Sequence, residues 1–495
     1  MKLDRTIDDW LNDAQFVFEV YLSFYHSDAD IELEDFLRHH LEEACRLIHP
    51  SISTIKEARE AATQARKYLQ KNVFSSDAFQ KTGWIDIIGH SHLDIIYLWP
   101  IKETFRKNCR TTTNMLSLMR EYPDFKYSQS QPYLYEELKV MYPKVFEEVK
   151  LRIQEGRWET IGAMYIEPDG NVVGPESLVR QILLGKQFLR QEFGIESRTV
   201  WLPDVFGVMY TLPQILKKSG IDYFSTVKLK IWADTNPFPY NTFWWRGPDG
   251  TDILTHFPAT HFGKNLDAET VRQHWHDFQD KNTVGESLFV YGLADGGGGP
   301  TREEIERGRR LINFPGLPTG KVDTVENFFA RLEQQTENLP IWDDELYLEA
   351  HRGTYTTKAD LKRQNRKAEL LYRDVEIISV LASLFGGDRV QMEINEGWKL
   401  ILVNQFHDTL PGTHRPEGVP DIKRDYETAF QIGNDLLKKA SQYIVHNLDK
   451  KADMLYFNTL SWERSDLISI PESMTGGSTI SEIGRASCRE RVCHR

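Results

Sequence analysis

Cysteine is scarce in this chain, and long apolar runs are missing from it. Only four cysteines occur among 495 residues, at Cys45, Cys109, Cys488 and Cys493. So few argue against a disulfide-dense extracellular scaffold and favour a reducing compartment. No stretch is apolar and long enough to span a bilayer, and the first fifteen residues contain no apolar signal-peptide core. We therefore expect a cytoplasmic protein without a membrane partner.

An excess of positive charge is also missing. Lysines and arginines number 60 against 73 aspartates and glutamates, which gives a formal net charge of −13. Proteins that bind nucleic acid need a basic face, so we expect no nucleic-acid partner. What the chain does have is a globular composition, with 40% hydrophobic and 12% aromatic residues. Its length allows two or three domains.

Strand and helix patterns alternate through the middle of the chain. The predicted strands cover residues 85–88, 125–128, 158–161, 199–202, 223–226, 253–255 and 288–290. Amphipathic stretches such as 140–154 and 176–192 lie between them. This alternation predicts an α/β fold with a parallel, (β/α) barrel-like sheet. Polar residues follow several strands, and the carboxyl ends of parallel strands are where such folds carry their sites.

Helical patterns flank this α/β region. An apolar stripe from Ala368 to Phe385 predicts one long helix, and further helices are predicted over 393–409 and 424–447. The predicted domains are a helical lead-in at 1–80, a catalytic domain at 81–340, a three-helix bundle contributing to the site at 341–450, the start of a β-sandwich domain at 451–481, and a tail at 482–495. The tail resembles a translated sequencing adapter, so we expect the β domain to be truncated near residue 481.

Two residues of metal-binding type lie two positions apart after the first predicted strand. His92 and Asp94 point to the same side of an extended backbone, so both side chains can reach one ion. Neutral imidazole and carboxylate are usual ligands of a catalytic zinc ion. An ordinary histidine–aspartate pair at a strand end is the alternative. His90 is placed to support a ligand from behind.

Two further motifs centre on an aspartate. Asp204 follows the apolar Trp201-Leu202-Pro203, so its carboxylate should be buried and needs a partner, either a metal ion or the start of a helix. Asp295 opens a run of four glycines, which leave it uncovered for a ligand. No Gly-Lys-Ser/Thr follows, which excludes a phosphate-binding loop. A general acid and a plain flexible loop are the two interpretations of Asp295.

The fourth motif is Asn404-Gln405-Phe406-His407-Asp408. His407 falls late in the helix predicted over 393–409 and is either a metal ligand or a satisfied core histidine. Asp408 points to another side of that helix, towards a sugar hydroxyl in our interpretation. Two histidines, two aspartates and a spare aspartate suit a catalytic metal ion with a nucleophile and an acid. The set indicates hydrolysis, with a sugar bond as the expected target.

Taken in order, the motifs resemble glycoside hydrolase family 38, the α-mannosidases, in its cytosolic and vacuolar branch. The matching residues are 89–94, 98–104, 167–171, 176–181, 201–207, 212–215, 295–301, 353–357 and 404–408. The resemblance covers residues 84–470 almost without gaps. It implies a (β/α) barrel-like catalytic domain, a three-helix bundle and β-sandwich domains.

The resemblance also implies a metal centre and a mechanism. The implied ligands of Zn²⁺, or of another divalent metal ion, are His92, Asp94, Asp204 and His407. Asp204 is in addition the implied nucleophile of a retaining mechanism. Asp295 is our prediction for the acid/base, expected about 5–5.5 Å from the nucleophile, with Glu345 and Glu349 as alternatives.

The substrate implied by the resemblance is a terminal α-linked mannose of an oligosaccharide. The predicted substrate-binding residues are Tyr97, Tyr165, Lys228, His351, Tyr355 and Asp408. Tyr97 and Tyr165 stand where the family usually has tryptophan, and Val208-Met209 stands where it usually has Tyr-Ser. These departures leave the linkage preference open. Family members often assemble into oligomers, so a homo-oligomer is expected of the full product.

Two other functions are compatible with the same residues. A carbohydrate de-N-acetylase would use aspartate and histidine around a metal ion to activate water, without a carboxylate nucleophile. An inactive sugar-binding relative would keep the ligands and lose the acid. The presence of Asp295 counts against the second alternative.

Overall fold

A computed structural model describes residues 4–25, 30–79, 82–448, 455–463, 465 and 492–494. The chain forms two compact units. Unit 1 comprises Met1–Lys362 and Leu402–Ile422, and unit 2 comprises Arg363–Ile401 and Lys423–Arg495. The chain therefore leaves unit 1 after Lys362 and returns to it at Leu402. None of the described helices is long and apolar enough to cross a membrane.

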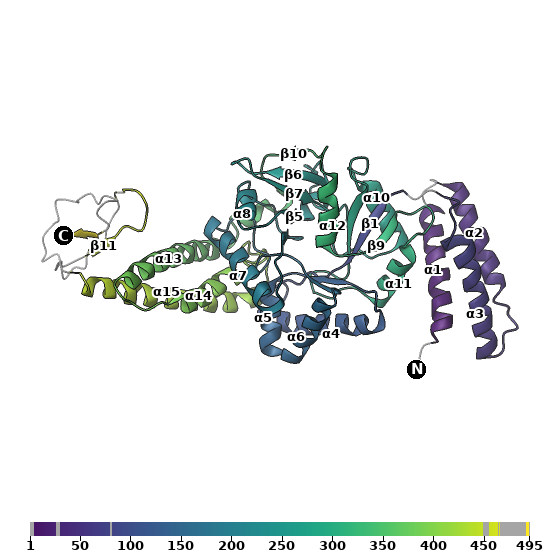
Figure 1. Cartoon of the computed structure of the whole chain (residues 1–495), viewed down its shortest axis with the longest axis horizontal. Coiled ribbons are helices and arrows are strands. Elements are labelled where there is room, and N and C mark those ends of the chain that lie inside the picture. The colour runs from purple at the N-terminus through teal and green to yellow at the C-terminus, as the bar shows by residue number, and fades with distance from the viewer. Residues whose placement is uncertain are drawn as a thin grey trace. The chain divides into compact units, whose positions relative to one another are not determined.

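Unit 1 begins with the helices α1 (Arg5–Tyr25), α2 (Ile31–Arg46) and α3 (Ile55–Leu69), followed by the π-helical turn η1 (Gln70–Phe74). The helix α3 starts with a capping box, in which Thr54 and Glu57 satisfy each other's backbone N–H groups. Apolar residues of these helices join the same core as the strands β1 and β8, and the Phe16 ring meets Phe314 edge-to-face at 5.1 Å. The lead-in helices thus pack on the α/β region of unit 1 (Figure 1).

The strands of unit 1 form three sheets. Their bounds are β1 (Trp84–Gly89), β2 (Tyr127–Gln129), β3 (Trp158–Thr160), β4 (Thr199–Trp201), β5 (Tyr223–Ser225), β6 (Thr242–Arg246), β7 (Asp252–His256), β8 (Glu286–Tyr291), β9 (Thr319–Val322) and β10 (Ile341–Trp342). The strand orders are β8-β1-β9, β2-β3 and β10-β6-β7-β5-β4. Hydrogen bonding continues between sheets, because His90 bridges Ser128 and the Ala163 N–H donates to the Thr199 carbonyl.

All seven predicted strands are present within a few residues, but the expectation of purely parallel pairing is wrong at one place. The strands β6 and β7 pair antiparallel, because the tight turn Gly247–Thr251 joins them and Gly250 takes a left-handed φ of +83° within it. The strands β9 and β10 were not predicted. The strand β9 reads Thr-Gly-Lys-Val and has no apolar run, and β10 has two residues.

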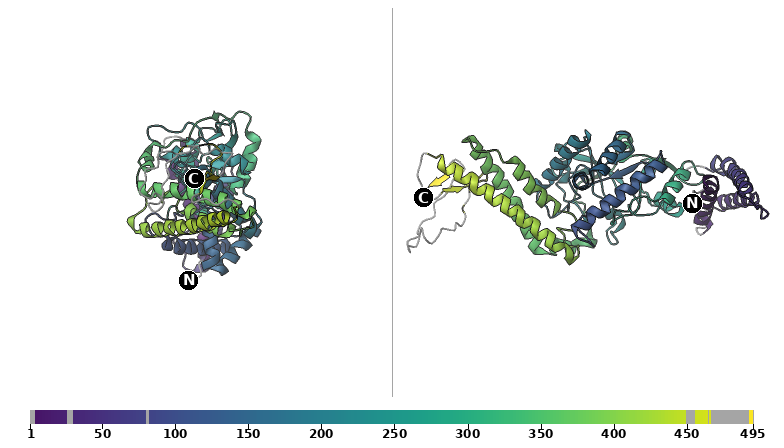
Figure 2. Two further views of the ribbon diagram at one scale, coloured as in Figure 1. Left: turned by 90° about the vertical axis from the view of Figure 1, so that its left-hand side faces the viewer. Right: turned by 90° about the horizontal axis from the view of Figure 1, so that it is seen from below.

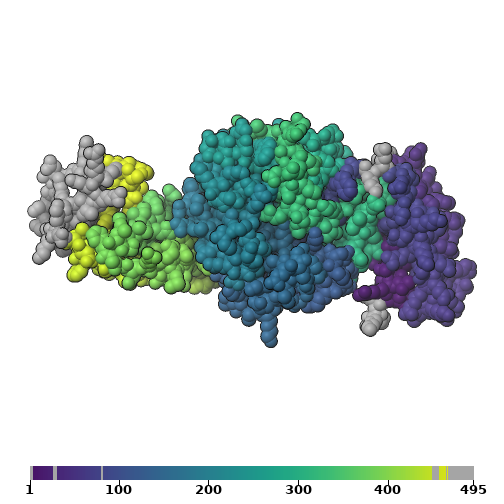
Figure 3. Space-filling model, viewed as in Figure 1, coloured from purple at the N-terminus to yellow at the C-terminus, as the bar shows by residue number. Residues whose placement is uncertain are grey.

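Helices connect and cover these strands (Figure 1). The space-filling view shows the atoms of these segments, coloured blue to green, packed against one another (Figure 3). Their bounds are α4 (Ile101–Glu121), α5 (Pro132–Met141), α6 (Pro143–Gln154), α7 (Pro175–Phe193), α8 (Leu212–Lys218), α9 (Lys228–Ile231), α10 (Ala268–Asp277), α11 (Arg302–Leu311) and α12 (Val325–Leu332), with 3-10 turns at η2 (Glu333–Gln335), η3 (Glu349–Tyr355) and η4 (Pro416–Gly418). The result is a mixed α/β fold followed by a helical region, as predicted.

Unit 2 is built from the long helices α13 (Ala359–Leu384), α14 (Gln391–Val403) and α15 (Val419–His446) (Figures 1 and 2). The buried Tyr372 lies where the three helices meet. Its ring packs edge-to-face on Trp398 of α14, and its hydroxyl donates to the Ala429 carbonyl of α15 at 2.8 Å. From the predicted stripe Ala368, Val375, Ile378 and Ala382 are buried, whereas Phe385 is exposed.

The helix predicted over 393–409 is too long by two turns. The helix α14 ends at Val403, and residues 404–412 form turns. The helix ends here because the next residues pair with another segment: Phe406 forms a β-bridge with Pro168, and the His407 N–H donates to the Glu167 carbonyl. His407 therefore lies in a turn of unit 1 and not on a bundle helix.

The predicted start of a β domain lies largely outside the described residues. Within the described part, β11 (Leu455–Phe457) pairs antiparallel with β12 (Val492–His494). The strand β12 falls in the segment that we predicted to be adapter-like.

Candidate metal centre and active site

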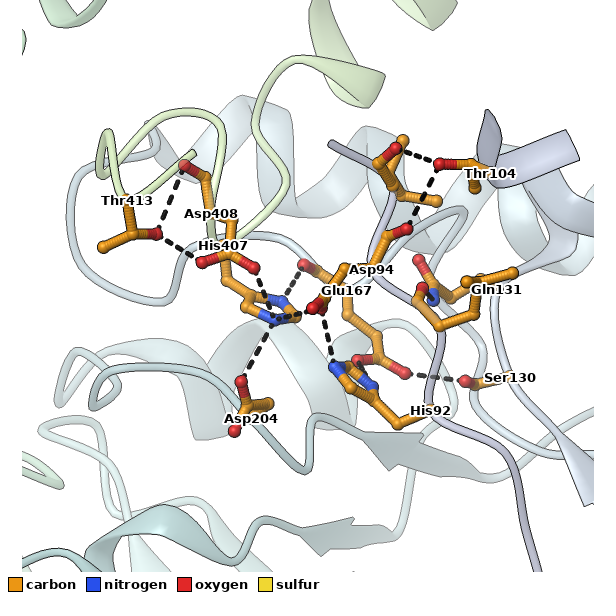
Figure 4. A network of polar contacts seen from close by, with 12 residues as sticks. His92, Asp94, Thr104, Ser130, Gln131, Glu167, Asp204, His407, Asp408 and Thr413 are labelled. Atoms are coloured by element: carbon orange, nitrogen blue, oxygen red, sulfur yellow. Dashed lines mark hydrogen bonds and ion pairs between the residues drawn. The ribbon is translucent and has the colours of Figure 1, made fainter. Parts of the chain in front are cut away.

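Three separate stretches of unit 1 bring two histidines and two aspartates together. His92 and Asp94 follow β1, Asp204 follows β4, and His407 lies in the turn after α14. All four are buried, and one ligand atom from each lies within 4.8 Å of the other three (Figure 4). The Asp94 Oδ1 atom is 3.0 Å from His92 Nε2 and 3.6 Å from His407 Nε2. The His407 Nε2 atom is 3.7 Å from Asp204 Oδ2.

The environment of His407 fits a metal ion at this cluster. Its Nε2 atom is fully buried and makes no hydrogen bond among the described residues. Burial disfavours a charged imidazole, yet Asp204 and Asp94 raise the His407 pKa to about 10. The buried carboxylates of Asp94 and Asp204 are stabilised by a positive charge beside them, which a metal ion can supply. Imidazole nitrogens and carboxylate oxygens are donor types that bind zinc in proteins.

Asp204 is held ionised by a neighbouring lysine. The Lys228 ammonium lies 2.7 Å from Asp204 Oδ1, donates to the Asp204 carbonyl at 3.1 Å and sits 4.4 Å above the Phe206 ring. Burial opposes the charge on Asp204, but His407 and Lys228 outweigh it and keep its pKa below the ordinary value. An ionised, nearly buried carboxylate of this kind can act as a nucleophile.

Asp295 opens the glycine run and lies next to Asp94. Its backbone has a left-handed φ of +53°, and its carbonyl accepts the Asp94 N–H at 3.0 Å. The next residues lie against Leu93, where a Cβ on Gly297 would come within 2.9 Å of the leucine side chain. The Asp295 side chain is exposed. Partial desolvation and the nearby carboxylates of Asp94 and Asp204 raise its pKa, as a general acid requires.

Asp408 and Tyr97 border the same carboxylates. Asp408 is buried, accepts a hydrogen bond from the Thr413 hydroxyl, and has its Oδ2 atom 3.9 Å from His407 Nε2. Burial, then Asp94, raises the Asp408 pKa to about 7. Burial and the charge of Asp408 raise the Tyr97 pKa as well. Both side chains therefore lie beside the predicted ligands.

The predicted substrate-binding residues His351, Tyr355 and Tyr165 differ in their relation to the cluster. The His351 ring packs on Phe206 at 4.5 Å, and Phe206 in turn meets the His407 ring at 5.9 Å. Tyr355 ends the turn η3, where burial and then Glu345 raise its pKa to about 12. Tyr165 is buried, and its hydroxyl donates to Glu136 at 2.7 Å. The structure thus brings His351 towards the cluster, whereas the Tyr165 hydroxyl is engaged elsewhere.

The alternatives for the acid/base differ in exposure, because Glu349 is half-buried and its Oε2 atom has no hydrogen-bond partner among the described residues. Glu345 is exposed. The Glu349 carboxylate accepts hydrogen bonds from the Thr235 N–H at 3.1 Å and the Asn236 N–H at 3.0 Å. Backbone hydrogen bonds, including its own, lower the Glu349 pKa. The Oε1 atom of Glu349 therefore caps the 235–236 loop.

One residue beside the cluster was not among the predicted site residues. Glu167 is buried, and its carboxylate lies 3.0 Å from His92 Nδ1 while its carbonyl faces His407 Nδ1 at 3.0 Å. Glu167 belongs to the motif Glu167-Pro168-Asp169-Gly170. That motif was the available signal, although nothing in it places the glutamate next to both histidines.

Comparison with known proteins identifies the family of this chain. Residues 83–345 match the glycosyl hydrolases family 38 N-terminal domain, and residues 349–444 match the alpha mannosidase middle domain. The chain belongs to glycoside hydrolase family 38. Its curated relatives include alpha-mannosidase 2C1 of Mus musculus, 34% identical over 90% of this chain and 43% of the relative, and alpha-mannosidase of Saccharomyces cerevisiae, 33% identical over 87% of this chain and 41% of the relative.

Solved structures show the same fold. The crystal structure of an alpha-mannosidase from Enterococcus faecalis V583 aligns with a TM-score of 0.69 at 21% identity, covering 78% of this chain and 46% of that chain. This chain spans less than half the length of the curated relatives named above.

Proposed function

We propose that this chain carries the catalytic machinery of a retaining, metal-dependent α-mannosidase that removes terminal α-linked mannose from oligosaccharides. The single observation that carries the proposal is that His92, Asp94, Asp204 and His407 are buried with their ligand atoms close together. Lys228 contacts the Oδ1 atom of Asp204. Membership of glycoside hydrolase family 38 and the α-mannosidase relatives support the substrate class.

Zn²⁺, or another divalent ion, is the proposed occupant of this cluster. It would be held by the two histidines and two aspartates, and when bound it would supply a fixed positive charge for sugar hydroxyls. Asp408 and Tyr97 border the cluster and are placed to hydrogen-bond those hydroxyls. His351, packed on Phe206, would line the approach to Asp204.

The proposed reaction proceeds in two displacements at the anomeric carbon. The Asp204 carboxylate attacks this carbon while Asp295 donates its proton to the departing glycosidic oxygen, so the C–O bond to the leaving sugar breaks as the ester to Asp204 forms. Asp295, now ionised, takes a proton from water as the water oxygen displaces Asp204. Mannose leaves with its configuration retained, and Asp295 regains its proton.

Three further predictions belong to this proposal. The strands β1, β2, β3, β4 and β5 would form one barrel-like arrangement, which the bridges between their sheets support. The cytoplasmic location rests on the low cysteine content. A homo-oligomer is proposed for the full-length protein by analogy with the family.

Hydrolysis of an aryl α-mannoside by the purified protein tests the function, with chelator, with added Zn²⁺, and with an Asp204→Ala variant. We expect chelator to remove the activity and added Zn²⁺ to restore it. The Asp204→Ala variant should be inactive. NMR should detect α-mannose as the first product. Because this chain is shorter than its relatives, the full-length gene product is assayed in parallel. Metal binding without hydrolysis in either protein would reject the proposal in favour of a binding protein. Release of acetate from N-acetylated sugars would favour the de-N-acetylase.

A further inference from the structure

Glu167 stands between the two histidines of the proposed metal centre and faces the same nitrogen of each. Its Oε2 atom is 3.0 Å from His92 Nδ1, and its backbone carbonyl is 3.0 Å from His407 Nδ1 (Figure 4). The two imidazole rings stack with a centroid distance of 5.3 Å and an interplanar angle of 22°. One residue thus contacts both rings on the side away from the cluster.

The Glu167 carbonyl selects one tautomer of His407, whereas His92 has a carboxylate oxygen 3.0 Å from each ring nitrogen, Glu167 Oε2 at Nδ1 and Asp94 Oδ1 at Nε2. An oxygen acceptor facing Nδ1 places the proton on that nitrogen in a neutral imidazole, and the lone pair is then left on Nε2. The Nε2 atoms are those that converge on Asp94, at 3.0 Å from His92 and 3.6 Å from His407. Glu167 therefore holds both rings with Nε2 turned towards the cluster, which is the orientation that a metal ligand needs.

Glu167 is itself held rigidly. The Ser130 hydroxyl donates to its Oε1 atom at 2.6 Å, so the two carboxylate oxygens have different partners. Its main chain is fixed by the bridge between Pro168 and Phe406 and by the Asp169 N–H, which donates to the Gln405 carbonyl at 2.8 Å. These contacts join the segment after β3 to the segment that carries His407. Movement of Glu167 would displace both histidines together.

We propose that Glu167 is a positioning residue that prepares His92 and His407 for metal binding. This inference rests on the proposed function, because it takes the cluster to be a metal site. Glu167 is only 1% exposed, so it acts through the histidines and does not touch substrate. The Glu167 carboxylate contacts His92, and its backbone carbonyl contacts His407. A side-chain substitution therefore removes the contact with His92 and leaves the one with His407.

Metal affinity of the purified protein, measured by competition with a chromogenic chelator for Zn²⁺, tests this role without depending on catalysis. We expect Glu167→Ala to weaken binding about 10–100-fold. Glu167→Gln should lose less, because it keeps the length of the side chain and a polar atom beside His92 Nδ1 while the charge is gone. In the Co²⁺-loaded protein the visible absorption bands should shift in Glu167→Ala, since the orientation of His92 changes.

Glu159→Gln is the matched control. Glu159 is a half-buried glutamate that also accepts a hydrogen bond from a serine hydroxyl, that of Ser128. Its other partners are the Val325 N–H and the Glu326 N–H at the start of α12, each at 3.0 Å. This variant should be destabilised and yet bind Zn²⁺ with the wild-type affinity. Ser130→Ala, a smaller change, provides a second variant of the proposed pair and should weaken binding a few-fold.

Three outcomes separate the inference from the function on which it rests. Wild-type affinity in the Glu167 and Ser130 variants, with intact circular dichroism, would overturn the positioning role and leave the proposed metal site standing. Absence of metal binding by the wild-type protein would overturn both. Equal weakening in Glu159→Gln would show general destabilisation and reject a specific role for Glu167.

Discussion

At the scale of single residues, the contact between Lys228 and Asp204 decides how reactive the proposed nucleophile is. Lys228 is 7% exposed and places its ammonium 2.7 Å from the carboxylate. Lys228→Met removes this charge, and its contact with the Phe206 ring, but keeps a side chain of similar length. We expect kcat/KM for an aryl α-mannoside to fall about 100-fold, a loss similar to that of one preorganised electrostatic contact in an active site.

Lys230→Met is the control for that prediction, because Lys230 lies on the same short helix α9. Its ammonium binds the Phe238 carbonyl at 3.0 Å and Gln279 at 2.8 Å, away from Asp204. The control should retain the wild-type kcat/KM. Equal losses in the two variants would show that α9 itself had been disturbed.

Asp295 is the second residue whose role can be tested alone. Partial desolvation and its carboxylate neighbours raise its pKa, which keeps the acid form available over a wider range of pH. Asp295→Asn should slow hydrolysis of substrates with poor leaving groups about 100–10,000-fold. Activated substrates with dinitrophenyl leaving groups need no protonation and should lose far less.

Steady-state kinetics with two α-mannosides, one alkyl and one dinitrophenyl, measures this difference. Glu345→Gln and Glu349→Gln serve as comparisons, since their carboxylates were the alternatives for the acid. A uniform loss for both substrates in Asp295→Asn would reject the acid/base role. A selective loss in one of the glutamate variants would transfer the role to it.

At the scale of secondary-structure elements, helix packing in unit 2 leaves no room at Gly397. A Cβ at this position of α14 would lie 1.6 Å from the Tyr372 hydroxyl oxygen, which itself binds the Ala429 carbonyl. Alanine would gain about 1 kcal/mol of helix propensity over glycine, but overpacking costs about 1–3 kcal/mol. Loss of the buried Tyr372 hydrogen bond adds to that cost.

We therefore expect Gly397→Ala to lower the free energy of unfolding of unit 2, as measured by urea denaturation of the whole protein. Glu396→Ala, exposed on the same helix, should change stability by no more than about 0.5 kcal/mol. A stabilised Gly397→Ala protein would show that Tyr372 can move aside without loss.

The strands β1, β8 and β9 share a charged cluster whose effect on stability depends on pH. Arg331 bonds to Asp86 of β1, to Glu286 of β8 and to Asp323 after β9. Burial, opposed by Arg331 and reinforced by Glu286, raises the Asp86 pKa to about 7. Because the folded protein then binds this proton more tightly than the unfolded chain, Asp86 contributes stability at low pH that is lost as pH rises towards 7.

Urea unfolding between pH 4.5 and 7.5 tests this dependence. The free energy of unfolding of Asp86→Asn should fall less with rising pH, the difference being at most about 1.4 kcal/mol per pH unit for one proton. Asp343→Asn, at an exposed position, should follow the wild-type curve. A wild-type slope in Asp86→Asn would show that Asp86 is ionised throughout this range.

Elements with strong local patterns could be predicted from the sequence, and those fixed by distant contacts could not. The apolar runs at β1, β4 and β5 were sufficient to locate the strands, and His92, Asp94 and Asp204 were expected together because each follows a strand end. The end of α14 at Val403 depends on the pairing of Phe406 with Pro168, more than 200 residues away. The place of Glu167 behind both histidines depends on the same pairing.

At the scale of the whole molecule, the proposed metal ion would join stretches of unit 1 that are far apart in the sequence. A ligand that binds only the folded state stabilises it by about 2.7 kcal/mol when its free concentration is 100 times Kd. We expect the Tm of the transition that unfolds unit 1 to rise on addition of Zn²⁺ and to fall with chelator. In His407→Ala most of this Zn²⁺-dependent rise in Tm should be lost. A rise as large as in the wild-type protein would show that the ion binds elsewhere.

The interrupted course of unit 1 has a consequence for how the protein is made. Residues 363–401 separate its two stretches, and a ribosome needs roughly 2–8 s to add those 39 residues. Throughout that interval the nascent chain already holds His92, Asp94 and Asp204, but His407 has not been synthesised. An ion that arrived early would meet only three of the four proposed ligands and could dissociate again. Stable binding of the proposed metal ion would therefore begin only after residues 402–407 have been synthesised.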